Sequence, residues 1–229
     1  MIVVLGFDGL DYRRAIKIKS LRQVEYSRVN LALPEGVPAI TAIIWGAYIT
    51  GTYNHGISYP CDQKTARVKV KTIFDYIPNS KPLWIPSLNP HPKYWGYASW
   101  LLIQSWKSEE FKRRYIEYTL ELFKEQREEF LKELRKGYNL IFAHFNLIDA
   151  LMHRIGDAVF KYYFLLAKFV DEVKSIISED DYLIILSDHG HTGTEHDENN
   201  AFYSCNHRLG LKNPKVTDFM GIFLALHFK

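Results

Sequence analysis

The sequence predicts an α/β fold in which a mainly parallel sheet is flanked by helices on both faces. Short apolar runs rich in β-branched residues, typical of strands covered on both sides, alternate along the 229 residues with segments of helical periodicity. This alternation is the pattern of βαβ units, which build parallel sheets. The sequence contains no repeat, low-complexity tract or linker-like segment, so we expect one domain that spans residues 1–229.

The first fifty residues predict a strand, a loop and a buried helix. The run MIVVLGF at 1–7 is continuously apolar, as in a central strand, and DGLD ends it before a short helix expected near 11–20. The segment 33–38 holds two prolines and a glycine, which predicts a loop. Residues 39–50 are apolar nearly all round, which predicts a buried helix, and Gly51 is well placed as its C-cap.

The pattern is less regular in the middle of the chain. Residues 66–77 are expected to form a short strand that runs into a helix, and PLWIP at 82–86 is expected to form another short strand. The segment 89–102 is rich in aromatic residues and proline, which predicts a loop. Two interpretations of the aromatic residues at 84–100 are open: core packing, or a wall for an organic leaving group.

Regular alternation returns in the second half. Residues 107–136 interleave charges of opposite sign at i,i+4 and carry apolar residues at helical spacing, which predicts a long surface helix. A strand is expected at 138–145, and an amphipathic helix at 159–177. The last elements are expected to be two strands and a closing helix, at 181–187, 201–205 and 216–226.

The composition excludes several classes of protein. Hydrophobic residues make up 47% and charged residues 24%, as in ordinary globular domains, and the net charge of +3 is scattered, which gives nucleic-acid binding no support. Cys61 and Cys205 match neither a metal nor a redox spacing, so we expect reduced thiols in a cytoplasmic protein. The apolar N-terminus lacks the features of a signal peptide, and no run reaches the roughly 18 apolar residues of a membrane span.

Acidic residues follow three of the predicted strands. Asp8 and Asp188 come directly after theirs, while His144 and Asp149 lie at or just past the end of a third. In parallel sheets ligands bind beyond the carboxyl ends of the strands, so these side chains are expected to meet at one rim. A single strand-end Asp is often only the N-cap of the next helix. Three carboxylates at one rim would repel one another unless a cation lay among them, so together they favour a metal site.

Histidines complete the candidate ligand set. Asp149 and His153 are four residues apart and share one face of a helical turn, and the segment LSDHGHTGTEH at 186–196 supplies His189 and His196. Taken singly, an i,i+4 Asp–His pair is more often a solvated helix pair, and His196 is more often a surface histidine. Taken together with the carboxylates, these nitrogen and oxygen ligands suit Zn²⁺, with Mn²⁺ possible.

Four blocks occur in an order that resembles the alkaline phosphatase superfamily, and within it the type I phosphodiesterase/nucleotide pyrophosphatase branch. The blocks are FDG, PAITAIIWGAYITG followed by HGI, DALMHRIG, and SDHG with a later His. The resemblance spans nearly the whole chain and implies a single metallohydrolase domain with an alkaline-phosphatase-like core. The chain is much shorter than typical members, so it implies only a minimal cap.

The resemblance also implies two Zn²⁺ ions and their ligands. One ion would be held by Asp8, Thr41, Asp188 and His189, and the other by Asp149, His153 and His196. His207 is the alternative to His196 as the last ligand. His191, His207 and Trp45 are expected to contact substrate, or in the case of His191 to lie just behind the ligands.

Thr41 is implied to be the catalytic nucleophile, because it precedes Gly51 at the spacing of the family's block. It would form a phospho-threonine while cleaving a small-molecule phosphate ester, foremost a phosphodiester or a nucleotide-type compound. A metal is what a hydroxyl with a pKa far above 7 needs in order to react as an alkoxide. Without the other blocks, Thr41 would be interpreted as an ordinary residue of a buried helix.

Several departures leave alternatives open. Ile44 stands where the nucleotide pyrophosphatases carry a phosphate-contacting Asn, and the stretch between Gly51 and HGI is two residues shorter than theirs. The alternatives are a phosphomonoesterase, a phosphonate hydrolase or phosphate-transferring mutase on the same site, and a non-catalytic metal- or phosphate-binding protein. No Cys occupies the nucleophile position, so a formylglycine sulfatase is not expected.

Overall fold

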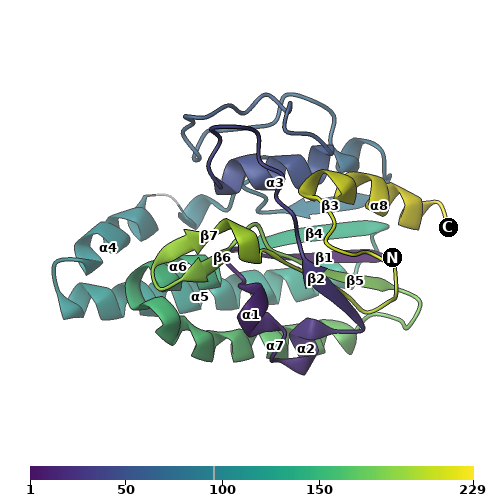
Figure 1. The fold of residues 1–229 in the computed structure, drawn as a ribbon. Helices are drawn as coiled ribbons and strands as arrows, with labels where there is room; N and C mark the ends of the chain where they lie inside the picture. The colour runs from purple at the N-terminus through teal and green to yellow at the C-terminus, as the bar shows by residue number, and fades with distance from the viewer. Residues whose placement is uncertain (95) are drawn as a thin grey trace.

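A six-stranded, mostly parallel sheet lies between two helical layers in the computed structural model, which describes residues 1–94 and 96–229 (Figure 1). Its strand order is β2-β8-β5-β1-β4-β3. The pairs β1–β4, β1–β5 and β3–β4 are parallel, whereas β8 pairs antiparallel with both β5 and β2. The strands are β1 Ile2–Phe7, β2 Glu25–Arg28, β3 Ser80–Leu83, β4 Leu140–Phe145, β5 Tyr182–Leu186 and β8 Phe202–Cys205. The predicted fold class is confirmed.

Helices cover both faces of this sheet (Figure 1). The longer ones are α3 Thr41–Thr50, α4 Tyr97–Ser105, α5 Glu109–Leu134, α6 Leu147–Ile155, α7 Tyr163–Lys174 and α8 Phe219–His227. Two short helices, α1 Tyr12–Ala15 and α2 Lys19–Arg22, follow β1. The 3₁₀ turns are η1 Ile73–Asp75, η2 Pro92–Tyr94, η3 Gly156–Tyr162, η4 Glu198–Asn200 and η5 Val216–Asp218.

The side chains of β1 divide between two cores, one on each face. Val3 and Leu5 belong to the cluster formed with α5, α6 and α7, whereas Ile2 and Val4 belong to the cluster formed with α3 and α8. Successive side chains of a strand point to opposite faces, so a strand covered on both sides must be apolar throughout. This explains the uninterrupted apolar run at the N-terminus, and β4 is fully buried in the same way.

Helix α3 is a core element, as its composition predicts. Every residue from Ala42 to Thr50 is buried, and Gly51 ends the helix in the left-handed conformation at φ 70°. The ring of Trp45 lies directly on Gly6 of β1, where a Cβ atom would come within 2.6 Å of the Trp45 Cη2 atom. Trp45 is fully buried, so the expectation that it contacts substrate is wrong. Its large ring instead packs α3 against the sheet.

The middle of the chain differs from the prediction in three places. The expected strand within 66–77 is absent, because Val68 and Lys69 donate their amide hydrogens to the carbonyl groups of Ser87 and His55 in neighbouring loops rather than to a strand. Strand β3 begins earlier than expected and includes Pro82, which an edge strand tolerates. The expected loop at 89–102 contains the start of α4, which begins after the turn at Gly96. Trp95, within the proposed aromatic wall, lies outside the described residues.

Two further elements were not expected. Strand β2 is a short edge strand whose residues alternate between half-buried and exposed, so it lacks the apolar run that marks the central strands. The segment with the many histidines forms a hairpin of β6 Gly190–Thr192 and β7 Glu195–Asp197. Among the described helices, none combines the length and apolar character that crossing a membrane requires.

The contact between Gly6 and Trp45 generates a stability prediction. Gly6→Ala is expected to lower the free energy of unfolding by about 1–3 kcal/mol, because the added methyl group overpacks a site that the indole ring already fills. Gly221→Ala is the matched control, since Gly221 lies inside α8 with open space around it and should gain up to about 1 kcal/mol of helix propensity. Urea unfolding measures both changes, and an unaffected Gly6→Ala protein would contradict this packing.

Candidate metal centre

The register of the sheet places polar side chains from three strands at one edge. Gly6 of β1 is paired with His144 of β4 on one side and with Leu186 of β5 on the other. Asp8 follows β1 by one residue, and Asp188 and His189 follow β5. Because all three strands are parallel, their carboxyl ends meet, as the sequence predicts. Asp8, Asp188, His189 and His144 are all buried.

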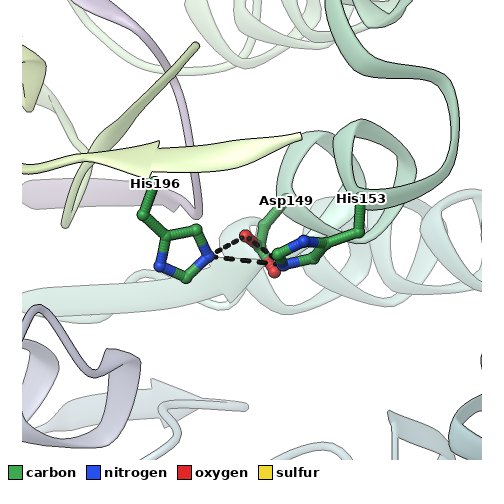
Figure 2. A group of neighbouring side chains, drawn as sticks. All are labelled: Asp149, His153 and His196. Atoms are coloured by element: carbon green, nitrogen blue, oxygen red, sulfur yellow. Dashed lines mark hydrogen bonds and ion pairs between the residues drawn. The ribbon is translucent and has the colours of Figure 1, made fainter. Parts of the chain in front are cut away.

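A second set of side chains closes over this edge from α6 and the β6–β7 hairpin. Helix α6 begins directly after β4, and the backbone amide of Asp149 donates to the carbonyl oxygen of Asp8. Nε2 of His196 lies 3.1 Å from Oδ1 of Asp149 and 3.3 Å from Nε2 of His153, while His153 Nε2 lies 3.4 Å from the same Asp149 oxygen. Figure 2 shows the three side chains converging. This is the second ligand set that the sequence predicts.

Asp149 also belongs to another group. Nε2 of His189 lies 3.2 Å from Oδ1 of Asp8 and 3.6 Å from Oδ1 of Asp149, so these three residues can offer atoms to one ion. Asp188 lies behind them, with Oδ2 3.7 Å from His189 Nε2 and Oδ1 accepting a hydrogen bond from the amide of Gly9. The two candidate sites are therefore adjacent and are joined through the Asp149 carboxylate.

Three buried atoms in this cluster lack hydrogen-bond partners, which points to a bound cation. They are Oδ1 of Asp8, Oδ2 of Asp188 and Nε2 of His189; the 3.2 Å approach of His189 Nε2 to Asp8 Oδ1 lacks the geometry of a hydrogen bond. Buried polar atoms are nearly always hydrogen-bonded, and an unsatisfied one costs about 1–3 kcal/mol. Three of them together, among three carboxylates, fit the lone pairs that a divalent cation would accept. The mixed imidazole and carboxylate donors suit Zn²⁺ or Mn²⁺.

The ionisation of the cluster shows how strongly the carboxylates interact. Burial, and then the charge of Asp8, raises the pKa of Asp188 to about 7. Burial alone would lower the pKa of His189, but the charges of Asp188 and Asp8 raise it well above its ordinary value. Burial would raise the pKa of Asp149, but hydrogen bonds from His153 and His196 hold it well below its usual range. Protons on the imidazoles thus offset charge that a divalent cation would offset more fully.

His144, which the sequence places at this rim but not among the candidate ligands, belongs to this centre. Its Nε2 atom lies 2.9 Å from Oδ2 of Asp8, and its ring packs edge-on against Trp45 at 5.0 Å between centroids. A hydrogen bond to one carboxylate oxygen orients the other, Oδ1, toward the candidate cation site. The signal available in the sequence was its position at the end of β4, beside a strand that ends in Asp8.

Thr41 faces the same cavity as the candidate ligands. It is the first residue of α3, is half-buried, and lines a cavity of about 280 Å³ together with Asp8, Asp149, His153 and His196. The N-terminal end of a helix carries a partial positive charge, which favours an anionic group in this position. The structure thus brings Thr41 to the site where a nucleophile is expected.

Two of the predicted substrate contacts lie elsewhere. His191 is buried, and its Nε2 atom lies 3.1 Å from the hydroxyl of Tyr163, outside the lining of the cavity. His207 has Nε2 3.1 Å from the carbonyl oxygen of Asp181, which precedes β5 and thus marks the opposite edge of the sheet. His207 is therefore corrected both as a substrate contact and as the alternative ligand. His196, which lies in β7 and therefore before β8 in the chain, is the histidine that reaches the cluster.

Two arginines of the segment after β1 hold the hairpin that carries His196. Arg13 pairs with the buried Asp11 at 2.6 Å and with Asp197 at 3.0 Å, and it donates to the carbonyl oxygen of His191 at 2.9 Å. Arg14 donates to the same carbonyl oxygen at 3.0 Å. Since a two-stranded hairpin is marginally stable by itself, these contacts help to order it, together with the stacking of His196 on His189 at 3.8 Å between ring centroids.

Comparison with known proteins shows likeness in structure alone. No protein-family model matches the chain, and no curated protein sequence matches it significantly. The 2-O GAG sulfatase BT1596 superposes with a TM-score of 0.62 at 11% sequence identity, covering 99% of this chain and 70% of that one. Ps i-CgsB, solved in complex with k-i-k-neocarrahexaose, gives a TM-score of 0.55 at 12% identity, covering 99% and 71%.

A third solved structure has almost the same extent as this chain. The PH0037 protein from Pyrococcus horikoshii superposes with a TM-score of 0.50 at 10% identity, covering 99% of this chain and 96% of that one. Of these three neighbours, BT1596 is described as a sulfatase. At these identities the likeness concerns the fold, and the chain has the alkaline-phosphatase-like core that its sequence predicts.

The arginine contacts predict that the hairpin depends on Arg13. Arg13→Ala is expected to cost about 1–3 kcal/mol, because it removes one partner of the buried Asp11, and to speed amide hydrogen exchange across residues 190–197. Arg22→Ala is the matched control, since Arg22 is exposed and its guanidinium lies over the ring of Tyr26, away from the hairpin. Unchanged exchange in the hairpin of Arg13→Ala would show that other contacts order it.

Proposed function

We propose that this protein is a two-metal hydrolase that cleaves phosphate esters, foremost phosphodiesters or nucleotide-type compounds, through a phospho-threonine intermediate. The observation that carries the proposal is the position of Thr41. Its hydroxyl-bearing side chain lies at the N-terminus of α3 and lines the same cavity as residues of both candidate ligand groups. The alkaline-phosphatase-like core supports the assignment, since its structural neighbour BT1596 is a sulfatase, an enzyme that hydrolyses esters.

The residues of the chain divide the work as follows. Asp149, His153 and His196 would hold one ion, and Asp8, Asp188 and His189 the other, with Thr41 beside it. Bound divalent cations would supply Lewis-acid polarisation and lower the pKa of the Thr41 hydroxyl. His144 orients Asp8 through its 2.9 Å contact, and the hairpin held by Arg13 presents His196.

The proposed reaction has two displacements. In the first, the Thr41 hydroxyl loses its proton to solvent, Oγ forms a bond to phosphorus, the bond from phosphorus to the ester oxygen breaks, and the departing alkoxide takes up a proton to leave as an alcohol. In the second, water loses a proton as its oxygen forms a bond to phosphorus, the bond from phosphorus to Thr41 Oγ breaks, Oγ takes up a proton, and inorganic phosphate or a monoester leaves. The partial positive charge at the N-terminus of α3 favours the phosphoryl group in both steps.

A sulfate-ester hydrolase is the second candidate, because the structural neighbour BT1596 is a sulfatase. The nucleophile position argues against a formylglycine enzyme, since it holds Thr41. Cys205 is buried in β8, and Cys61 does not line the cavity that holds the ligands. A phosphonate hydrolase or a non-catalytic metal- or phosphate-binding protein would use the same ligand set, and turnover and product analysis separate them.

The ligand assignment predicts that metal binding stabilises the protein. Zn²⁺ at about 100 times its dissociation constant is expected to add about 2.7 kcal/mol, which raises Tm by about 5–10 °C in a domain of this size. His196→Ala should reduce this shift at the same Zn²⁺ concentration, because it removes a ligand from the exposed side of the cluster. His207→Ala should leave it unchanged, because that histidine lies at the opposite edge of the sheet. A wild-type Tm that does not respond to Zn²⁺ or Mn²⁺ would contradict the metal assignment.

The nucleophile assignment predicts which variants lose activity. With metal present, the wild type is expected to hydrolyse bis(p-nitrophenyl) phosphate or p-nitrophenyl phosphate, and Thr41→Ala should fall to the rate of the buffer blank. Thr41→Ser retains a hydroxyl group and should keep part of the activity. The faster substrate decides between diesterase and monoesterase, and faster cleavage of p-nitrophenyl sulfate would favour the second candidate. Full activity in Thr41→Ala would exclude Thr41 as nucleophile.

A further inference from the structure

The cavity extends beyond the candidate ligands into a space between α4 and α5. Beyond the cluster its apolar and aromatic lining is formed by Tyr94, Ala98, Leu102, Tyr115, Tyr118 and Leu122, of which Ala98 and Leu102 come from one face of α4 and the last three from α5. Polar side chains of Gln63, Ser99, Thr119 and Asn146 also line the cavity, and the hydroxyl groups of Ser99 and Thr119 donate to the carbonyl oxygens of Tyr94 and Tyr115. Pockets of this kind, largely apolar with a few polar groups, are the usual form of small-molecule sites.

This extension carries no charge among the described residues. Apart from the candidate ligands and His144, every residue that lines the cavity is uncharged, and the lining contains neither Lys nor Arg. A second phosphate, a carboxylate or a sulfated sugar chain placed here would lose its hydration without gaining a cationic partner. The cavity therefore disfavours polyanionic substrates.

The tyrosines of the lining already use their hydroxyl groups on the protein. Tyr94 donates to Oε1 of Gln126 at 3.0 Å, and Tyr115 donates to the carbonyl oxygen of Ala150 at 3.0 Å. Tyr118 donates to the carbonyl oxygen of Lys93 at 3.4 Å. With their hydroxyl protons engaged, these residues offer mainly ring carbon to an occupant, which suits another aromatic or apolar group.

The volume limits the size of that group. The whole cavity, including the part beside the ligands, is about 280 Å³. An apolar cavity of about 150 Å³ binds benzene, and pockets for drug-sized ligands span roughly 300–1,000 Å³. A phosphoryl group beside the ligands therefore leaves room for about one ring or a short chain.

We propose that the extension between α4 and α5 binds the organic part of the substrate, and that this part is small, uncharged and apolar, such as a single aryl ring. The inference rests on the proposed function for the phosphoryl end of the substrate. It narrows the substrate class from phosphate esters in general to aryl or short alkyl esters. Nucleotides have a larger and more polar organic part than this extension can hold, so we do not expect them among the preferred substrates.

Binding of non-hydrolysable phosphonates tests the pocket separately from catalysis. In the Zn²⁺-loaded protein, phenylphosphonate is expected to bind about tenfold to a hundredfold more tightly than methylphosphonate, as burial of one ring predicts. 4-Carboxyphenylphosphonate should lose this advantage, because the extension has no cationic partner for the carboxylate. Isothermal titration calorimetry measures all three affinities.

A pair of variants on α4 locates the effect. Ala98→Phe should fill the extension and abolish the preference for the phenyl group while methylphosphonate still binds. Ile103→Phe places the same side chain on the exposed face of the same helix and should leave both affinities unchanged. Circular dichroism melting curves confirm that both variants fold.

The outcomes separate this inference from the proposed function. Equal affinity for phenylphosphonate and methylphosphonate, no binding of either, or a preference for phenylphosphonate that survives Ala98→Phe would refute the proposed pocket. A phenyl preference that Ala98→Phe removes supports the pocket even if no p-nitrophenyl ester is hydrolysed, and in that case the proposed function fails alone. Hydrolysis of a p-nitrophenyl phosphate ester without a preference for phenylphosphonate would support the proposed function and refute the proposed pocket.

Discussion

Mutual repulsion among three carboxylates gathered at one largely buried edge of the sheet is the constraint on which the rest of the structure depends. Asp8, Asp149 and Asp188 come from separate elements, and two of them are fully enclosed. Burying charge is costly unless partners offset it, and the imidazoles around the cluster do so only in part, since buried oxygen and nitrogen atoms stay unpartnered. Such a cluster is a candidate cation site, and Asp149, common to both candidate ligand groups, places the two positions side by side.

The surrounding elements supply rigidity to that edge. The parallel register of β1, β4 and β5 brings the ligand-bearing loops together. Close-packed apolar layers on both faces of the sheet hold those strands in place. His144 and Trp45 form one continuous contact from the ligand Asp8 to the core helix α3, whose first residue is Thr41. The nucleophile candidate and the first candidate ligand are therefore held by the same packing.

Fold and chemistry are separable in this protein. BT1596 and Ps i-CgsB share its architecture at 11% and 12% identity, so the fold does not by itself specify the chemistry of the site, where this chain holds Thr41 as the candidate nucleophile. Under the proposed function, the segment that would select among esters is α4. This helix packs on α5 through Leu101 and Tyr115 and contributes to the uncharged wall of the cavity.

The sequence by itself determined the sheet class, the buried helix with its Gly51 cap, and the strand-end positions of the candidate ligands, because these depend on local periodicity and on ligand chemistry. The tertiary structure alone decided the rest. Strand β2 and helix α4 have weak local patterns and form through pairing and packing with distant segments. His144 and His196 reach the cluster whereas His207 does not, and residue type cannot distinguish one histidine from another. Proximity between side chains far apart in the chain follows from strand order and register, which no local pattern specifies.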